Sequence, residues 1–263
     1  MKILVIHGSM RKGNTYALTR EIIDRLCARP DVECTEISVA NLELPFCCSC
    51  HTCFAKGEEF CPHYEIMQAV EAALMESDGV ILSGTTYMWS LNAAMKNLLD
   101  HLSYGFHRPA LFGKKGMVIV TSSGNGEKDV AQYLHTVMGQ WGINGAMILT
   151  LNAKERQLLS AQKISAKLDH AATQFYQLTA SGRYLPPKLT NIIAHNAFRA
   201  MSLSDFAEYE CDTRFWQQEG YSNRAYPVKA GPKSAIGALM HGVAKFSTKM
   251  LGRVFAERLG LKQ

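Results

Sequence analysis

The feature that most constrains the fold is the alternation of five short apolar runs with segments of helical periodicity over residues 1–180. The runs are dense in Ile, Val and Leu and lack the polar residue at every second position that a half-exposed strand shows. Such runs are typical of strands covered on both faces of a parallel sheet. They are Lys2–His7, Cys34–Val39, Gly79–Gly84, Gly116–Thr121 and Gly145–Leu151.

Between these runs, apolar residues recur at steps of three and four, which indicates one buried helix face. The predicted helices are Thr15–Cys27, Tyr64–Met75, Asn92–Leu102, Val130–Trp141 and Lys154–Leu178. Strict alternation predicts a doubly wound α/β sandwich of three layers, with five parallel strands in the order 2-1-3-4-5. Ligands of such folds bind where the strand order reverses, so the segments after strands one, three and four should carry function.

The pattern changes after Ser181, which divides the chain into a first domain, 1–180, and a largely helical C-terminal extension, 181–263. Adjacent prolines in Arg183–Lys188 predict a linker, and the chain reads as irregular as far as Pro232. The apolar periodicity of Ser234–Leu259 then predicts a basic amphipathic helix. It could lie on an anionic membrane as a peripheral contact, or dock on its own domain or on a partner subunit.

The net charge of +5 arises in the C-terminal third. Residues 183–263 hold 12 Lys and Arg against 6 Asp and Glu, while residues 1–182 hold 16 against 17. Aromatic residues are sparse among these charges, so we expect no nucleic-acid partner. No apolar run reaches the roughly 18–20 residues that span a bilayer, and the first strand is too short for a signal peptide. We therefore expect a cytoplasmic protein.

The segment Gly8–Thr15 joins strand one to the first helix and has the composition of a phosphate-binding loop. Helix-terminal amides, two glycines, hydroxyls and one arginine together suit a bound phosphate. It is neither a dinucleotide fingerprint nor a Walker loop. The alternative is an ordinary turn in which Asn14 or Thr15 caps the helix. The candidate phosphate ligands are Ser9, Arg11, Gly13, Asn14 and Thr15.

The pattern Gly-Ser-x-Arg-x-Gly-Asn-Thr in Gly8–Thr15 resembles the FMN phosphate loop of the NAD(P)H-dependent FMN reductase group in the flavodoxin-like superfamily. The resemblance extends to Ser83–Ser90 and to Met95, Lys96 and Asp100, although Thr85 stands where the family usually has proline. It implies a flavodoxin-like fold, FMN as cofactor, NAD(P)H as co-substrate and a homo-oligomer, commonly a dimer.

Two further loops complete the expected flavin site. The second would lie against the flavin ring, where an apolar and aromatic wall excludes water. The third is rich in hydroxyls and glycine and could bond the flavin edge or ribityl chain, but alone it is a turn signature. The second loop contributes Thr85, Thr86, Tyr87, Met88 and Trp89, and the third contributes Thr121, Ser122, Ser123, Gly124 and Asn125.

Five of the eight cysteines lie within fifteen residues. Cys47, Cys50, Cys53 and Cys61 resemble the compact motif of iron-sulfur flavoproteins, which implies a [4Fe-4S] cluster. Three alternatives stay open: tetrahedral zinc on the same thiols, a Cys50–Cys53 dithiol, or no ligand. Cys48 is expected to be a bystander, with an exchange of roles between Cys47 and Cys48 as the alternative. Cys27, Cys34 and Cys211 are isolated, and we expect them to be buried packing residues.

No hydrolase-type constellation is present, so the chemistry is expected to be that of the flavin. Tyr104, His107 and Arg108 are candidates for the substrate side of the ring, with a structural loop as the equal alternative. The first functional hypothesis is an NAD(P)H-dependent FMN oxidoreductase that reduces a flavin, a quinone or another small acceptor. The second is an electron carrier between redox proteins, and the third is an inactive flavin fold with a regulatory or membrane role.

Overall fold

The computed structural model of the protein describes residues 1–202 and 209–218. Its centre is a parallel sheet in the order β2-β1-β3-β5-β6. These strands are β1 (Lys2–His7), β2 (Glu33–Ser38), β3 (Gly79–Tyr87), β5 (Lys115–Ser122) and β6 (Ala146–Asn152). Both the five parallel strands and their order were predicted from the sequence. The strand count differs, because β4 (Ser90–Leu91) pairs antiparallel with the end of β3 and makes a sixth strand.

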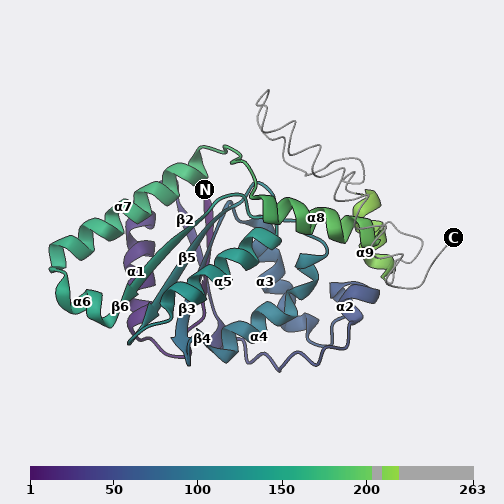
Figure 1. Ribbon diagram of the computed structural model, residues 1–263, viewed down its shortest axis with the longest axis horizontal. Coiled ribbons are helices and arrows are strands. Elements are labelled where there is room, and N and C mark those ends of the chain that lie inside the picture. The colour runs from purple at the N-terminus through teal and green to yellow at the C-terminus, as the bar shows by residue number, and fades with distance from the viewer. Residues whose placement is uncertain (203–208, 219–263) are drawn as a thin grey trace.

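Helices cover both faces of this sheet (Figure 1). Alternate residues of β1 point to opposite faces, so Ile3 and Val5 enter one hydrophobic core and Leu4 and Ile6 enter the other. The first core lies under α1 (Asn14–Cys27) and α7 (Ala161–Ala180). The second lies under α3 (Tyr64–Glu76), α4 (Ala93–His101) and α5 (Glu127–Gln140). Burial on both faces explains why the strands read as continuous apolar runs.

The helix predicted over Lys154–Leu178 is divided into two, α6 (Ala153–Leu158) and α7. Each has its own N-terminal cap: Asn152 and Glu155 form a capping box on α6, and the Ser160 side chain accepts a hydrogen bond from the amide of Lys163 on α7. Leu159 between them has extended backbone angles.

The prediction of irregular structure after Lys188 is wrong for the described residues. They form α8 (Leu189–Ser202) and α9 (Glu210–Gln218). The apolar pattern of α8 misleads because its buried face is largely polar, while Leu189, Ile193 and Met201 are exposed. The buried residues of α8 are Ile192, His195, Asn196, Arg199 and Ser202.

Among the described residues, no helix combines the length and apolar character needed to cross a bilayer. The basic segment Ser234–Leu259 lies outside the described residues, so its membrane and docking alternatives stay predictions. α7 ends at Ala180, and the division into domains at this position also stays a prediction. The remaining short elements are α2 (Thr52–Ala55) and the 3-10 turns Val39–Asn41, Glu58–Phe60 and Ser103–Phe106.

Candidate functional site

The first loop leaves β1 through a glycine that is held on both sides. The Gly8 amide donates to the carbonyl of Ser83 at 2.9 Å, and Asn92 Nδ2 donates to the carbonyl of Gly8 at 2.7 Å. A Cβ at this position would clash with the Ser83 carbonyl oxygen. Only glycine therefore fits where the loop crosses the end of β3.

The N-terminus of α1 is open to an anion. Gly13 precedes the helix, no side chain caps it, and its first turn holds no acidic residue. The amides of the first turn have no acceptor within the helix, and they carry the positive end of its dipole. Met10, Arg11 and Lys12 are exposed, so the loop is not packed shut.

Neither residue that the sequence offered as a cap acts as one. Asn14 Oδ1 accepts from Arg156 of α6 at 3.1 Å. Thr15 turns its hydroxyl the other way, toward Thr85 and Thr121. The ordinary capped turn is thus contradicted, and the first-turn amides stay available.

A chain of four hydroxyls joins the three predicted loops. Ser9 Oγ lies 2.7 Å from Thr85 Oγ1, which lies 2.8 Å from Thr15 Oγ1, and Thr15 Oγ1 lies 2.7 Å from Thr121 Oγ1. Ser9 and Thr15 come from the first loop, Thr85 from the second and Thr121 from the third. The structure therefore brings the three loops together at one end of the sheet, and the bonded pair Thr15–Thr121 alone spans 106 positions of the chain.

The second loop ends in a tight turn with bulky residues at strained angles. Thr86 and Tyr87 pair with Leu91 and Ser90 across β3 and β4, leaving Met88 and Trp89 as the two turn residues. Their φ angles are 46° and 62°, the left-handed region that Asn and Gly usually fill in such hairpins. Met88 is 95% exposed and Trp89 66%. Strain of this kind on exposed large apolar side chains is a mark of function.

Two buried polar atoms of this region lack a hydrogen-bond partner within the described chain, Thr86 Oγ1 and Asn92 Oδ1. Leaving such atoms unpaired costs about 1–3 kcal/mol each. Thr86 belongs to the second loop, and Asn92 holds the first loop through its other amide atom. Unpaired atoms at these positions are what a site for a polar ligand would leave.

The third loop divides into a fixed start and an open tip. Ser122 Oγ donates to Glu127 Oε2 at 2.7 Å, and Asn152 Nδ2 donates to Glu127 Oε1 at 3.0 Å. Burial favours a higher pKa for Glu127, but these two hydrogen bonds outweigh it and hold its pKa below the ordinary value. Ser123, Gly124 and Asn125 are exposed, so of the predicted residues these three are open to a ligand.

The cysteine segment is anchored by one residue that the sequence did not single out. Asn97 of α4 accepts from the Cys47 amide at 3.0 Å and donates to the carbonyls of Leu44 and Pro45. Ser49 and His51 have φ angles of 51° and 58°, so the backbone turns sharply between the thiols. Among the predicted ligands Cys47, Cys53 and Cys61 are partly buried and Cys50 is exposed.

The four thiols lie close enough to influence one another. Burial raises the pKa of Cys53 to about 11, and the thiols of Cys61, Cys47 and Cys50 add to the shift, while Arg108 opposes it. Hydrogen bonds from Thr52 lower the pKa of Cys50. The structure therefore gathers the predicted thiol ligands into one neighbourhood, in which a bound cation would stabilise the thiolates.

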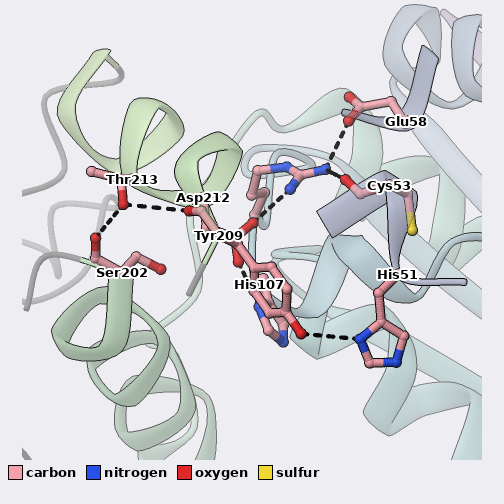
Figure 2. Close-up of polar contacts among 9 residues, drawn as sticks. His51, Cys53, Glu58, His107, Ser202, Tyr209, Asp212 and Thr213 are labelled. Atoms are coloured by element: carbon pink, nitrogen blue, oxygen red, sulfur yellow. Dashed lines mark hydrogen bonds and ion pairs between the residues drawn. The ribbon is translucent and has the colours of Figure 1, made fainter. Parts of the chain in front are cut away.

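The described part of the C-terminal extension docks on this segment through a buried ionic network (Figure 2). Asp212 of α9 bonds Arg108 at 2.5 Å and His107 at 2.6 Å. Arg108 also donates to the Cys53 carbonyl at 2.9 Å and to Glu58 at 2.8 Å. The hydrogen bonds of the His107 and Arg108 side chains are thus with the cysteine segment and α9, and their role beside a flavin stays a prediction.

Replacing Asp212 with alanine is expected to lower the free energy of unfolding by about 2–4 kcal/mol, because it leaves the buried Arg108 guanidinium without one of its anions. Arg108 and Asp212 are 5% and 3% exposed in this pair. Urea denaturation measures the change. The matched control is Asp169→Ala, which breaks a pair with Arg25 whose acid is 61% exposed and should cost less than about 1 kcal/mol. Equal losses of unfolding free energy in Asp212→Ala and Asp169→Ala would contradict a stabilising role of the buried Arg108–Asp212 pair.

Tyr104 lines a cavity of about 380 Å³ together with Glu71, Arg108, Trp141 and Phe215. Burial raises the pKa of Glu71 to about 7, and the acids Glu58 and Glu59 add to this, while a hydrogen bond with Tyr104 opposes it. Burial likewise raises the pKa of Tyr104. Tyr104 is therefore neutral at physiological pH, and Glu71 changes its charge near pH 7.

The Glu71 carboxyl makes the free energy of unfolding depend on pH, and the sign of this dependence follows from its raised pKa. The pKa of Glu71 in the folded state exceeds its ordinary value of 4.5. Its contribution to the free energy of unfolding is therefore complete below pH 4.5 and is lost as the pH rises through about 7. Between pH 5 and pH 8 the native chain should lose about 1–2 kcal/mol of unfolding free energy relative to Glu71→Gln, after allowance for solvent screening. Urea denaturation at both pH values measures this. Parallel profiles of the two proteins would contradict the assignment.

Comparisons with known proteins identify the family to which the chain is similar. Residues 1–153 match the family model described as NADPH-dependent FMN reductase. The chain is 30% identical over 231 residues to a protein of Archaeoglobus fulgidus named iron-sulfur flavoprotein, and the match covers 84% of this chain and 100% of that protein.

Two solved structures are similar in fold. An NADH:FMN oxidoreductase superposes with a TM-score of 0.54 at 21% identity, over 72% of this chain and 97% of that chain. An azoreductase from Bacillus anthracis superposes with a TM-score of 0.53 at 16% identity, over 66% of this chain and 97% of that chain. At these identities the similarity shows the fold alone.

Proposed function

Because the chain belongs to the NADPH-dependent FMN reductase family, we propose that it binds FMN across its three loops and transfers electrons from NAD(P)H to a small acceptor, such as a flavin or a quinone. The observation that carries the proposal is the hydroxyl chain Ser9–Thr85–Thr15–Thr121, which links all three loops beside an uncapped helix N-terminus.

The residues present fit FMN on the observations of this structure. The first-turn amides of α1 would hold the phosphate, with Arg11 as an exposed cation beside it. Thr86 Oγ1 is a buried hydroxyl without a partner among the described residues, and Ser123–Asn125 present open backbone. When bound, FMN supplies hydride and single-electron chemistry, and the protein supplies binding, orientation and exclusion of water.

The side chains around the site would divide this work. Trp89 and Met88 form an apolar wall at the end of β3 that can exclude water from one side of the ring. Thr85 and Thr121 fix the loops relative to each other through Thr15. Ser122 and Asn152 hold Glu127 as a carboxylate, which keeps the start of the third loop in place.

An absorption spectrum of the protein purified without air, before and after addition of NADPH or NADH, tests the proposal. We expect flavin bands that bleach with at least one of the two nucleotides and return when a quinone is added. A colourless protein that binds no added FMN would contradict FMN binding. Flavin bands that neither nucleotide bleaches would contradict the reductase activity and leave FMN binding in place.

A second candidate function is favoured by the four cysteines and by the relative named iron-sulfur flavoprotein. Cys47, Cys50, Cys53 and Cys61 would hold a [4Fe-4S] cluster, and the chain would then pass single electrons between redox proteins. One helix links both sites, because Asn92 at the start of α4 holds Gly8 and Asn97 holds Cys47. Five residues of helix separate these anchors by roughly 7–8 Å.

Measuring the iron and acid-labile sulfide of the anaerobically purified protein distinguishes the iron-sulfur electron carrier from the flavin reductase. The carrier requires about four of each per chain. Cys47→Ser should lose both, while Cys48→Ser, the exposed neighbour, should retain them. Equal loss in the two variants would contradict the ligand assignment, and a chain without iron would leave the flavin reductase alone.

We further propose that the protein is a homo-oligomer in which the Met88–Trp89 turn meets a second copy. Tyr87, Met88 and Trp89 form a contiguous exposed apolar segment at the edge of the site. Sedimentation should show a dimer or larger assembly, and Met88→Lys should shift it toward the monomer. A native chain that sediments as a monomer would contradict this.

A further inference from the structure

A second group of metal-binding side chains lies beside the four cysteines and joins Cys61 to two histidines. Cys61 Sγ and ring nitrogens of His63 and His101 all lie within 4.8 Å of one another. His63 Nδ1 and His101 Nε2 face each other at 2.9 Å. Cys61 and His63 come from the turn that precedes α3, and His101 comes from the end of α4. The fold, rather than the local spacing alone, therefore assembles the group.

The orientation of His101 is fixed by its other nitrogen. His101 Nδ1 lies 2.9 Å from the carbonyl oxygen of Asn97. A carbonyl can only accept, so Nδ1 carries the proton and Nε2 turns a lone pair toward His63 and Cys61. His101 is 5% exposed. In metal-binding histidines one ring nitrogen usually bonds a backbone carbonyl or a carboxylate, and the other turns its lone pair toward the ligand group, as His101 does here.

The donor set matches a borderline-soft divalent ion. Thiolate and imidazole together suit Zn²⁺, with Zn–N distances of about 2.0–2.1 Å and a Zn–S distance of about 2.3 Å. Two tetrahedral nitrogen ligands then lie about 3.3 Å apart, so the 2.9 Å pair needs to open by only a few tenths of an ångström. A hydrogen bond between the two imidazoles would account for the short distance between His63 and His101. It would not account for the Cys61 thiol that lies close to both rings.

We propose that Cys61, His63 and His101 form a mononuclear site for a divalent ion of the zinc class, with the fourth position left to water or a small ligand. The site differs from zinc on the four cysteines, because two of its three protein ligands are histidines. It shares Cys61 with the four-cysteine set. An ion at this site and a cluster on Cys47, Cys50, Cys53 and Cys61 therefore exclude each other.

The test is a titration of the full chain, stripped of metal with a chelator under anaerobic conditions, with Co²⁺ as the probe. We expect one Co²⁺ per chain, with visible bands and a thiolate charge-transfer band. His63→Ala should weaken Co²⁺ binding at least tenfold. His63 precedes α3 without making a cap hydrogen bond, so its loss should not cost the helix. His101→Gln should act in the same way, and circular dichroism checks that both variants fold.

His51→Ala and Cys50→Ser are the matched controls. His51 belongs to the same segment but bonds Tyr209, and Cys50 belongs only to the four-cysteine set. Both should keep Co²⁺ binding. X-ray absorption of the Zn²⁺-loaded chain should show one sulfur and two or three lighter ligands. Four sulfurs, or binding that Cys50→Ser abolishes and the histidine variants leave intact, would overturn the proposal, as would a chain that binds no Co²⁺.

Discussion

Replacing Asn14 with aspartate is expected to stabilise the FMN-free protein and to weaken FMN binding. A carboxylate in the first turn of α1 interacts favourably with the helix dipole, which should raise the free energy of unfolding by about 0.3–1 kcal/mol. The same charge repels a phosphate held by the first-turn amides, so the dissociation constant of FMN should rise by roughly 10–100-fold. Urea denaturation and fluorescence titration with FMN measure the two effects.

A variant that is more stable but binds FMN more weakly cannot owe the weaker binding to partial unfolding. Ala161→Asp is the matched control, since it places the same charge in the exposed first turn of α7, outside the three loops. It should also stabilise the chain, or leave its stability unchanged, but should not alter FMN binding. If both variants weaken FMN binding equally, the effect is one of net charge and the phosphate assignment to α1 is wrong.

Gly8→Ala is expected to lower the free energy of unfolding by about 1–3 kcal/mol and to abolish FMN binding. The added methyl group would clash with the Ser83 carbonyl, which is backbone and cannot turn away, and it would also press on Met95. The hydrogen bond from the Gly8 amide to that carbonyl would be lost or lengthened. Chemical denaturation measures the stability, and FMN titration measures the site.

Gly124→Ala is the matched glycine control. An added Cβ at Gly124 meets no atom within 4 Å, so the free energy of unfolding should change by less than about 0.5 kcal/mol. A similar loss of stability in both variants would contradict the close approach of the first loop to β3 as the cause, because an effect of Gly→Ala on the unfolded chain alone raises the stability.

The sheet and the three loops could be predicted because the residues within each strand and each loop carry the signal. The density of Ile and Val reports burial on both faces of a strand, and glycine with hydroxyl residues after a strand reports a tight turn. Thr85 shows the limit of such signals. In the sequence it is a departure from the usual proline, but in the structure it is the centre of the hydroxyl chain, bonded to Ser9 and Thr15.

The anchors of the cysteine segment could not be predicted, because each acts across a long sequence separation. Asn97 lies 50 residues from Cys47, and Asp212 lies 104 residues from Arg108. Neither residue belongs to a motif. The spacing of Cys61 and His63 was a usable signal, but His101 joins them only because α4 packs beside the start of α3.

The prediction that the isolated cysteines are buried packing residues was wrong for Cys27, and Cys34 and Cys211 are only partly buried. Cys27 was expected to be buried but is exposed, and its sulfur lies 2.7 Å from that of Cys34. The end of α1 and the start of β2 meet there, seven residues apart along the chain. Burial, together with the Cys27 thiol, raises the pKa of Cys34 well above its ordinary value.

FMN binding as proposed here requires that backbone amides at the start of α1 hold the terminal phosphate of FMN. Amide resonances of the ¹⁵N-labelled chain, recorded with FMN and with riboflavin, which lacks the phosphate, test this most directly. We predict that FMN shifts the amides of Asn14, Thr15 and Tyr16 strongly and binds much more tightly than riboflavin. Equal affinities, with these three amides unmoved by FMN, would contradict it.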